Sequence, residues 1–179
     1  LVKHTDENLE KYAITESARE IAEFVDTLSN WYVRRCRDRY WGSEMTEDKV
    51  AAYMTLYTVL ETLSRLLAPY VPFVTEEIYQ NLVCTVDKDA PESIHLCDYP
   101  IADETMIDKA LEADMDEVLK IVVLGRAARN GSNMKNRQPL ANMVVKAEKE
   151  LGEYFVDIIR EELNLKAVTF TDDVSSLVS

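Results

Sequence analysis

Apolar and small side chains recur at every third or fourth position along an unusually long stretch near the N-terminus. This spacing predicts one helix over residues 15–39 with a single buried stripe. Gly42 is expected to end that helix in the left-handed conformation. The stripe consists of Ile14, Ala18, Ile21, Ala22, Val25, Leu28, Tyr32, Val33, Cys36 and Tyr40.

Helical patterns also dominate the next 90 residues. Thr46 is expected to cap a second helix that Pro69 ends, and Pro72 is expected to begin a third. Residues 84–100 are expected to be irregular, with a short extended piece at 93–96. Only four glycines and five prolines occur in 179 residues, which favours long helices over a fold with many tight turns. The predicted helices cover residues 46–68, 72–82 and 103–129.

The pattern changes near the C-terminus. Residues 143–145 and 165–170 are typical of strands, and residues 148–162 are typical of an amphipathic helix that Asn164 ends. The predicted fold class is therefore mainly α, with a bundle of about four main helices and a small C-terminal β-α-β unit. We expect a helical domain over residues 1–131 and an α/β subdomain over residues 132–179.

Positive charge is gathered in two places on an acidic chain. The net charge is −13, which taken alone argues against a nucleic-acid partner. Residues 31–41, however, hold four arginines and one aspartate, and residues 118–147 hold six cations and no acid. Chance clustering on solvated faces is one explanation, and a binding surface is the other.

Catalytic and metal-binding patterns are missing from the sequence. It contains no nucleophile elbow, phosphate-binding glycine loop or zinc-protease motif. The three cysteines lie far apart, so neither a disulfide framework nor a metal site is expected. No apolar run is long enough to span a membrane, and the N-terminus does not resemble a signal peptide. We expect reduced thiols in a cytoplasmic protein with no membrane partner.

The first basic cluster combines groups that suit unpaired RNA bases. Arginine matches phosphate geometry and stacks on bases, as indole rings do. The tryptophans could instead cap the bundle core, and Arg35 and Arg39 could pair with acids such as Glu61. The candidate RNA-binding residues of this cluster are Asn30, Trp31, Arg34, Arg35, Arg37 and Trp41.

The second basic cluster lies at a helix end and in the loop after it. A helix C-terminus favours cations, which is reason enough for Arg126 and Arg129 to stand there. Lys135 and Arg137 have no such structural reason, so we expect them to contact phosphate. The candidate RNA-binding residues of this cluster are Arg129, Lys135, Arg137 and Gln138.

Several segments spread over nearly the whole chain resemble isoleucyl-tRNA synthetases. The most specific are LSNWYVRRCRDRYW at 28–41 and RQPL at 137–140. The segment LAPYVPFVTEE at 67–77 is shared with valyl and leucyl relatives and is less specific. Further similar segments are SIHL at 93–96, GRAARN at 125–130 and EELNLK at 161–166.

This resemblance implies the anticodon-binding domain of a class I synthetase, together with the start of its C-terminal region. The parent enzyme would use ATP and Mg²⁺ to charge tRNA(Ile), with catalytic and editing domains upstream in the same chain. The partner implied here is the anticodon stem-loop of tRNA(Ile), with no DNA partner, no catalytic residue and no cofactor in this region. Cys36 and Asp38 depart from the family pattern, in which serine and arginine are common.

Two other interpretations remain open at this stage. The chain could be the equivalent domain of a valyl-tRNA synthetase, although the segments at 28–41 and 137–140 favour the isoleucyl family. It could also be a helical structural or interaction domain that binds no RNA. The second alternative predicts that the clustered arginines pair with acids inside the protein.

Overall fold

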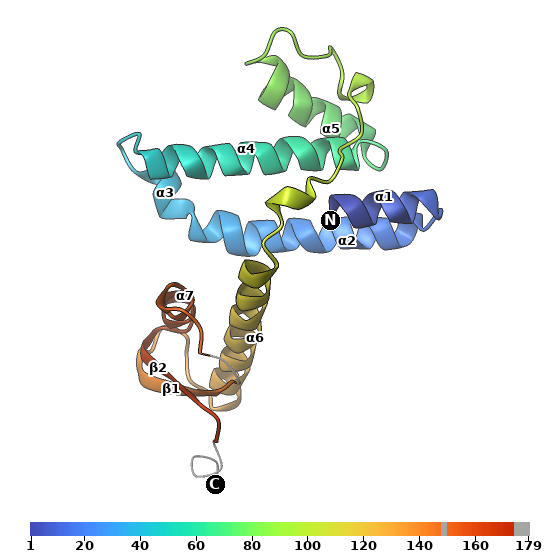
Figure 1. Cartoon of the computed structure of the whole chain (residues 1–179). Coiled ribbons are helices and arrows are strands. Elements are labelled where there is room, and N and C mark those ends of the chain that lie inside the picture. The colour runs from blue at the N-terminus through green and yellow to red at the C-terminus, as the bar shows by residue number, and fades with distance from the viewer. Residues whose placement is uncertain (148–149, 174–179) are drawn as a thin grey trace. The chain divides into compact units, whose positions relative to one another are not determined.

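The protein was analysed as a computed structural model, which describes residues 1–147 and 150–173 (Figure 1). The predicted mainly α-helical fold is confirmed. The chain forms two compact units, Leu1–Glu104 and Thr105–Ser179.

Unit 1 is built from helices, with a long irregular segment between η2 and η3 (Figure 1). Thr46 caps α4 as predicted, because its hydroxyl accepts a hydrogen bond from the Lys49 backbone N–H at 3.2 Å. Pro72 begins α5, also as predicted. The elements are α1 (Val2–Glu10), α2 (Ile14–Thr27), the π-helical η1 (Leu28–Val33), α3 (Arg37–Trp41), α4 (Glu47–Leu67), α5 (Pro72–Tyr79), the π-helical η2 (Gln80–Cys84) and the 3₁₀ turn η3 (Ile94–Leu96).

The single helix expected over residues 15–39 is wrong. The chain is α-helical to Thr27, π-helical through η1 and α-helical again in α3. A π-helical turn holds more residues than an α-helical one, so side chains after it are rotated from the positions that an uninterrupted α-helix would give. Gly42 ends α3 with φ −52° and ψ 144°, so it is not left-handed as expected.

Two apolar clusters form the core of unit 1. Ile21 of α2 packs with Leu63 and Leu66 of α4, and half-buried side chains of α1 and α2 surround them. The second cluster joins Tyr79 and Val83 to η3, which replaces the extended piece expected at 93–96. Ile94 can lie in this cluster because the 3₁₀ turn bends the chain back towards α5.

Unit 2 contains the predicted β-α-β arrangement. It consists of β1 (Leu140–Lys146), α7 (Glu153–Leu163) and β2 (Leu165–Thr171), preceded by α6 (Lys109–Gly131). The strands are parallel, with Leu140 opposite Leu165 and Lys146 opposite Thr171. Asn164 ends α7 in the left-handed conformation with φ 50°, as predicted.

Helix α6 belongs to unit 2, whereas the sequence suggested that it closes the helical domain at residue 131. The reason is its close contact with α7. Gly125 lies against the Leu163 side chain, and Arg126 forms an ion pair with Glu162 at 2.5 Å. The boundary between the two units therefore falls in the chain between Glu104 and Thr105.

Candidate nucleic-acid interface

The first candidate surface is held in place by contacts between the segment 28–42 and helix α4. The Tyr40 and Tyr53 rings lie 5.1 Å apart, and the Tyr53 hydroxyl donates to the Tyr40 carbonyl at 3.3 Å. The Tyr32 hydroxyl donates to the Ala52 carbonyl at 3.4 Å. The side of the segment that carries Tyr32 and Tyr40 therefore packs against α4.

Two charged residues complete the attachment to α4. Arg39 donates to both carboxylate oxygens of Asp48, at 2.8 and 2.7 Å, in a two-pronged ion pair. The hydrogen bond to Asp48 raises the pKa of Arg39 above its already high value. The Lys49 ammonium donates to the Gly42 carbonyl at 2.5 Å. Arg39 is thus paired internally, as the structural alternative expected, but with Asp48 rather than Glu61, which pairs with Arg65.

The side chains that remain at the surface include two arginine–tryptophan pairs. The Arg34 guanidinium lies 5.9 Å from the centre of the Trp31 ring, and the Arg37 guanidinium lies 5.3 Å from that of Trp41. Trp41 is 75% exposed and Trp31 is half-buried. Trp41 therefore does not cap the core. We call Asn30, Trp31, Arg34, Arg37 and Trp41 the arginine–tryptophan surface.

The two other polar candidates of this segment differ in exposure. Asn30 is exposed, and its amide donates to the Asp26 carboxylate at 2.8 Å. Arg34 also donates to the Asn30 backbone carbonyl at 2.7 Å. Arg35 is half-buried, so less of it is available to a partner.

The second candidate surface is the loop over residues 132–139, which we call the basic loop. Lys135, Arg137 and Gln138 are exposed. Lys135 and Arg137 have no acidic partner among the residues that the structure describes. The Gln138 backbone N–H donates to the Lys135 carbonyl at 2.9 Å, so the loop contains a tight turn.

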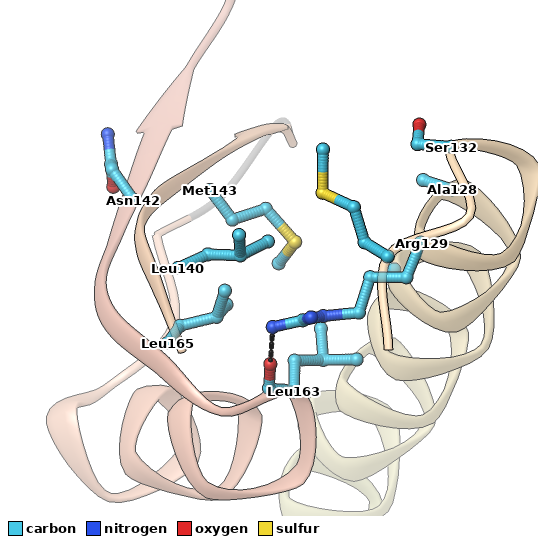
Figure 2. A pocket seen from close by; sticks show the side chains of 10 residues that line it. Ala128, Arg129, Ser132, Leu140, Asn142, Met143, Leu163 and Leu165 are labelled. Atoms are coloured by element: carbon cyan, nitrogen blue, oxygen red, sulfur yellow. Dashed lines mark hydrogen bonds between the residues drawn. The ribbon is translucent and has the colours of Figure 1, made fainter. Parts of the chain in front are cut away.

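Arg129 lies beneath this loop and is only 4% exposed. Its guanidinium donates to the backbone carbonyls of Lys135 and Gln138, both at 3.0 Å, and to that of Leu163 at 2.6 Å. Figure 2 shows this side chain reaching from α6 to the end of α7. Arg129 was expected to contact RNA, but the structure places its guanidinium among backbone carbonyls rather than at the surface.

Beside Arg129 is a cavity of about 150 Å³ between α6 and β1 (Figure 2). It is lined mainly by apolar side chains such as Leu140, Met143 and Leu165. The Arg129 guanidinium, the one charged group on its wall, is already bonded to carbonyls. The other polar side chains on its wall are Ser132 and Asn142.

The structure identifies two contributors that sequence reasoning missed. Lys49 fixes the end of α3 and lies 5.9 Å from the centre of the Tyr53 ring. Asn164 donates its side-chain amide to the carbonyls of Asn136 and Arg137, at 3.3 and 3.1 Å. The left-handed position of Asn164 was visible in the sequence, but its bond to a loop 27 residues away was not.

Among the residues that the structure describes, neither a metal-binding cluster nor a membrane-spanning helix is present. Within residues 1–147 and 150–173, no cluster of three or more histidine, cysteine, aspartate or glutamate side chains could hold a metal ion. Over the same ranges, no helix has the length and apolar character needed to cross a bilayer.

Comparison with known proteins gives a consistent result. A family model described as the anticodon-binding domain of tRNA ligase matches residues 1–145. The isoleucine–tRNA ligase of Clostridium novyi is 56% identical over 179 residues, which is all of this chain. The isoleucine–tRNA ligase of Dehalococcoides mccartyi is 48% identical over 172 residues, or 94% of the chain. The isoleucine–tRNA ligase 2 of Bacillus cereus is 48% identical over 162 residues, or 89% of the chain.

The relatives are much longer than the chain. The aligned region spans 17% of the Clostridium and Dehalococcoides proteins and 15% of the Bacillus protein. The family model ends inside β1, whereas the Clostridium alignment continues through α7 and β2.

Proposed function

The chain belongs to the anticodon-binding domain family of tRNA ligases. We propose that it binds the anticodon stem-loop of tRNA(Ile) as part of an isoleucine–tRNA ligase. Two relatives that match 99% or more of its length are named isoleucine–tRNA ligase. The observation that carries the proposal is the arginine–tryptophan surface, in which two guanidinium groups lie over tryptophan rings on an otherwise acidic chain.

Such a surface can bind anticodon bases because the anticodon loop of the tRNA presents them unpaired. An unpaired base stacks on an indole or a guanidinium plane, and its edge remains free for hydrogen bonds. Trp41 and Arg37 supply stacking planes, and Asn30, which contacts Arg34 earlier in the same segment, supplies an amide. Stacking supplies affinity, and the amide adds discrimination between bases.

The RNA backbone requires a different kind of contact. Lys135 and Arg137 of the basic loop are exposed, and arginine fits phosphate oxygens through two parallel N–H groups. In this proposal they bind phosphates of the tRNA backbone, and Gln138 adds a neutral hydrogen-bonding group. Such contacts position the RNA without reading its sequence.

The remaining steps of aminoacylation belong to other parts of the ligase. We propose that ATP and Mg²⁺ are bound by a catalytic domain upstream in the same protein, that an editing domain is also upstream, and that the enzyme acts in the cytoplasm. The residues of this chain then only bind and orient the tRNA. Neither DNA nor a membrane is a partner in this proposal.

The proposal is tested by titrating labelled tRNA(Ile) into the chain at low salt. Replacing Arg34→Ala and Arg37→Ala together should weaken binding at least about 10-fold, because base stacking is worth about 1–3 kcal/mol per base. A tRNA(Ile) with an exchanged anticodon should compete poorly. Binding should also weaken as salt rises.

The matched control removes the same charge elsewhere in unit 1. Lys11 and Arg19 are exposed on or beside α1 and α2, so Lys11→Ala with Arg19→Ala should change affinity by no more than about 3-fold, the size of a general charge effect. Equal losses in both double variants, or equal competition by the exchanged anticodon, would contradict anticodon recognition. A valine tRNA that binds better than tRNA(Ile) would favour the valyl alternative.

A further inference from the structure

We infer that Arg129 and Asn164 are positioning residues, which hold the basic loop in its RNA-binding shape before any RNA is present. This inference rests on the proposed function, because it takes Lys135 and Arg137 as the contacts to the tRNA backbone. It adds a role for two side chains that do not touch the RNA.

The first observation is the number of loop carbonyls that Arg129 holds. Its Nη1 donates to the Lys135 carbonyl and its Nη2 to the Gln138 carbonyl, each at 3.0 Å. The same Nη2 donates to the Leu163 carbonyl at 2.6 Å, so the guanidinium ties the loop to the end of α7. Because the side chain is 4% exposed, water competes little for these bonds.

The second observation is that Asn164 binds the backbone carbonyls of the two residues between Lys135 and Gln138. Its amide donates to Asn136 and Arg137, at 3.3 and 3.1 Å. The carbonyl oxygens of four successive residues, 135–138, are thus all bound by side chains from other elements of unit 2. Surface loops usually leave such groups to water.

These bonds have two consequences for an anionic ligand. Four carbonyl dipoles are satisfied by donors of the protein, so their partial negative charge is offset where phosphate would approach. The loop backbone is also fixed on folding, so binding RNA need not order it. Loss of either clamping side chain should therefore weaken RNA binding without removing any RNA contact.

A double-mutant cycle separates this role from a direct one. The variants are Arg129→Met and the pair Lys135→Ala with Arg137→Ala, each titrated with labelled tRNA(Ile) at low salt. We expect each to weaken binding about 10-fold, and the combination to be little worse than either alone, because Arg129 acts through the loop cations. The matched control is Lys120→Gln. It removes an exposed cation from the same helix, where Lys120 pairs with Glu117, and it should leave the loop unchanged.

Hydrogen exchange of the backbone amides in the basic loop provides a readout without RNA. Arg129→Met should speed exchange there several-fold, Arg129→Lys should restore part of the protection, and the Lys135/Arg137 alanine pair should leave it unchanged. Asn164→Gly keeps a backbone that tolerates φ 50° but loses the amide donors, so it should show a smaller change in the same direction.

Several results would overturn the inference. Affinity losses that add fully in the cycle, or loop exchange unchanged by Arg129→Met, would each do so. If Arg129→Met does not fold, Arg129→Lys and Asn164→Gly replace it in the same cycle. If the unaltered chain binds no tRNA(Ile), the proposed function fails and the inference with it; if the chain binds but the losses add, only the inference fails.

Discussion

Arginine side chains serve two different physical roles in this chain. Arg129 is buried, where its fixed fork of N–H groups satisfies backbone carbonyls from two segments. Arg37 keeps its guanidinium over the exposed ring of Trp41, where a base can stack. Lysine could not replace either residue fully, because it has neither the planar face nor the fork.

Of the four glycines, Gly125 is the one at which an added methyl group would meet the closest contact. A Cβ atom there would overlap the buried Leu163 side chain, so α6 and α7 must separate or Leu163 must leave its position. We expect Gly125→Ala to destabilise unit 2 by about 1–2 kcal/mol, since overpacking costs about 1–3 kcal/mol and helix propensity returns up to about 1 kcal/mol. Faster hydrogen exchange of the slowest amides in α7 would measure the loss.

Gly131 provides the matched control for that substitution. It ends the same helix, has no atom within 4 Å of a built Cβ and does not have a positive φ. Gly131→Ala should therefore leave exchange in α7 unchanged or slightly slower. Equal destabilisation by both substitutions would show that the α6–α7 contact is not the cause.

At the scale of elements, one carboxylate fixes the irregular segment after α5. Glu76 accepts hydrogen bonds from the Gln80 amide at 2.8 Å, the Ser93 hydroxyl at 2.8 Å and the Ile94 backbone N–H at 3.0 Å. These bonds, the one from Gln80 first, lower the pKa of Glu76 below its ordinary value. Glu76 thereby helps place Ile94 in the apolar cluster around Tyr79.

The pKa of Glu76 gives a pH-dependent prediction for unit 1. Since the folded-state pKa is lowered, the stabilisation is complete above the unfolded value near 4.5 and is lost as pH falls through the lowered folded-state pKa. Glu76→Gln should reduce the melting temperature at pH 7. The difference in melting temperature between the variant and the unaltered chain should become smaller below about pH 4. A difference that grows on acidification would contradict this assignment.

Glu77→Gln is the control for the Glu76 variant. It removes the same charge at the next position, where the carboxylate accepts only an exposed bond from Asn81 among the described contacts. We expect a much smaller change in melting temperature at pH 7.

Sequence reasoning succeeded where local chemistry decides the structure. The Thr46 cap, the proline at the start of α5 and the left-handed Asn164 each depend on one residue and its neighbours. The burial of Arg129 depends in part on its bond to the carbonyl of Leu163, 34 residues away, which residue spacing could not reveal. The sequence pattern also gave no sign of the π-helical turns. The exposed positions of Trp41, Lys135 and Arg137 agree with the predicted surface.

For the whole molecule, the central question is how a chain of net charge −13 can bind RNA. Half of its 20 lysines and arginines lie in residues 31–41 and 118–147, and some of these are already neutralised, such as Arg39 by Asp48 and Arg126 by Glu162. The remaining acidic surface repels polyanions that do not fit these segments. We therefore expect weak, strongly salt-dependent affinity for tRNA(Ile) and still weaker binding of unrelated RNA.

The measurement that tests this account most directly is photo-crosslinking from the anticodon itself. tRNA(Ile) with a photoreactive base in the anticodon loop would be irradiated with the chain at low salt, and the crosslinked peptide identified by mass spectrometry. The account predicts crosslinks to residues 28–41, which decrease in Arg34→Ala/Arg37→Ala and are absent from a probe in the acceptor stem. Crosslinks that avoid residues 28–41, or that form equally from the acceptor stem, would contradict it.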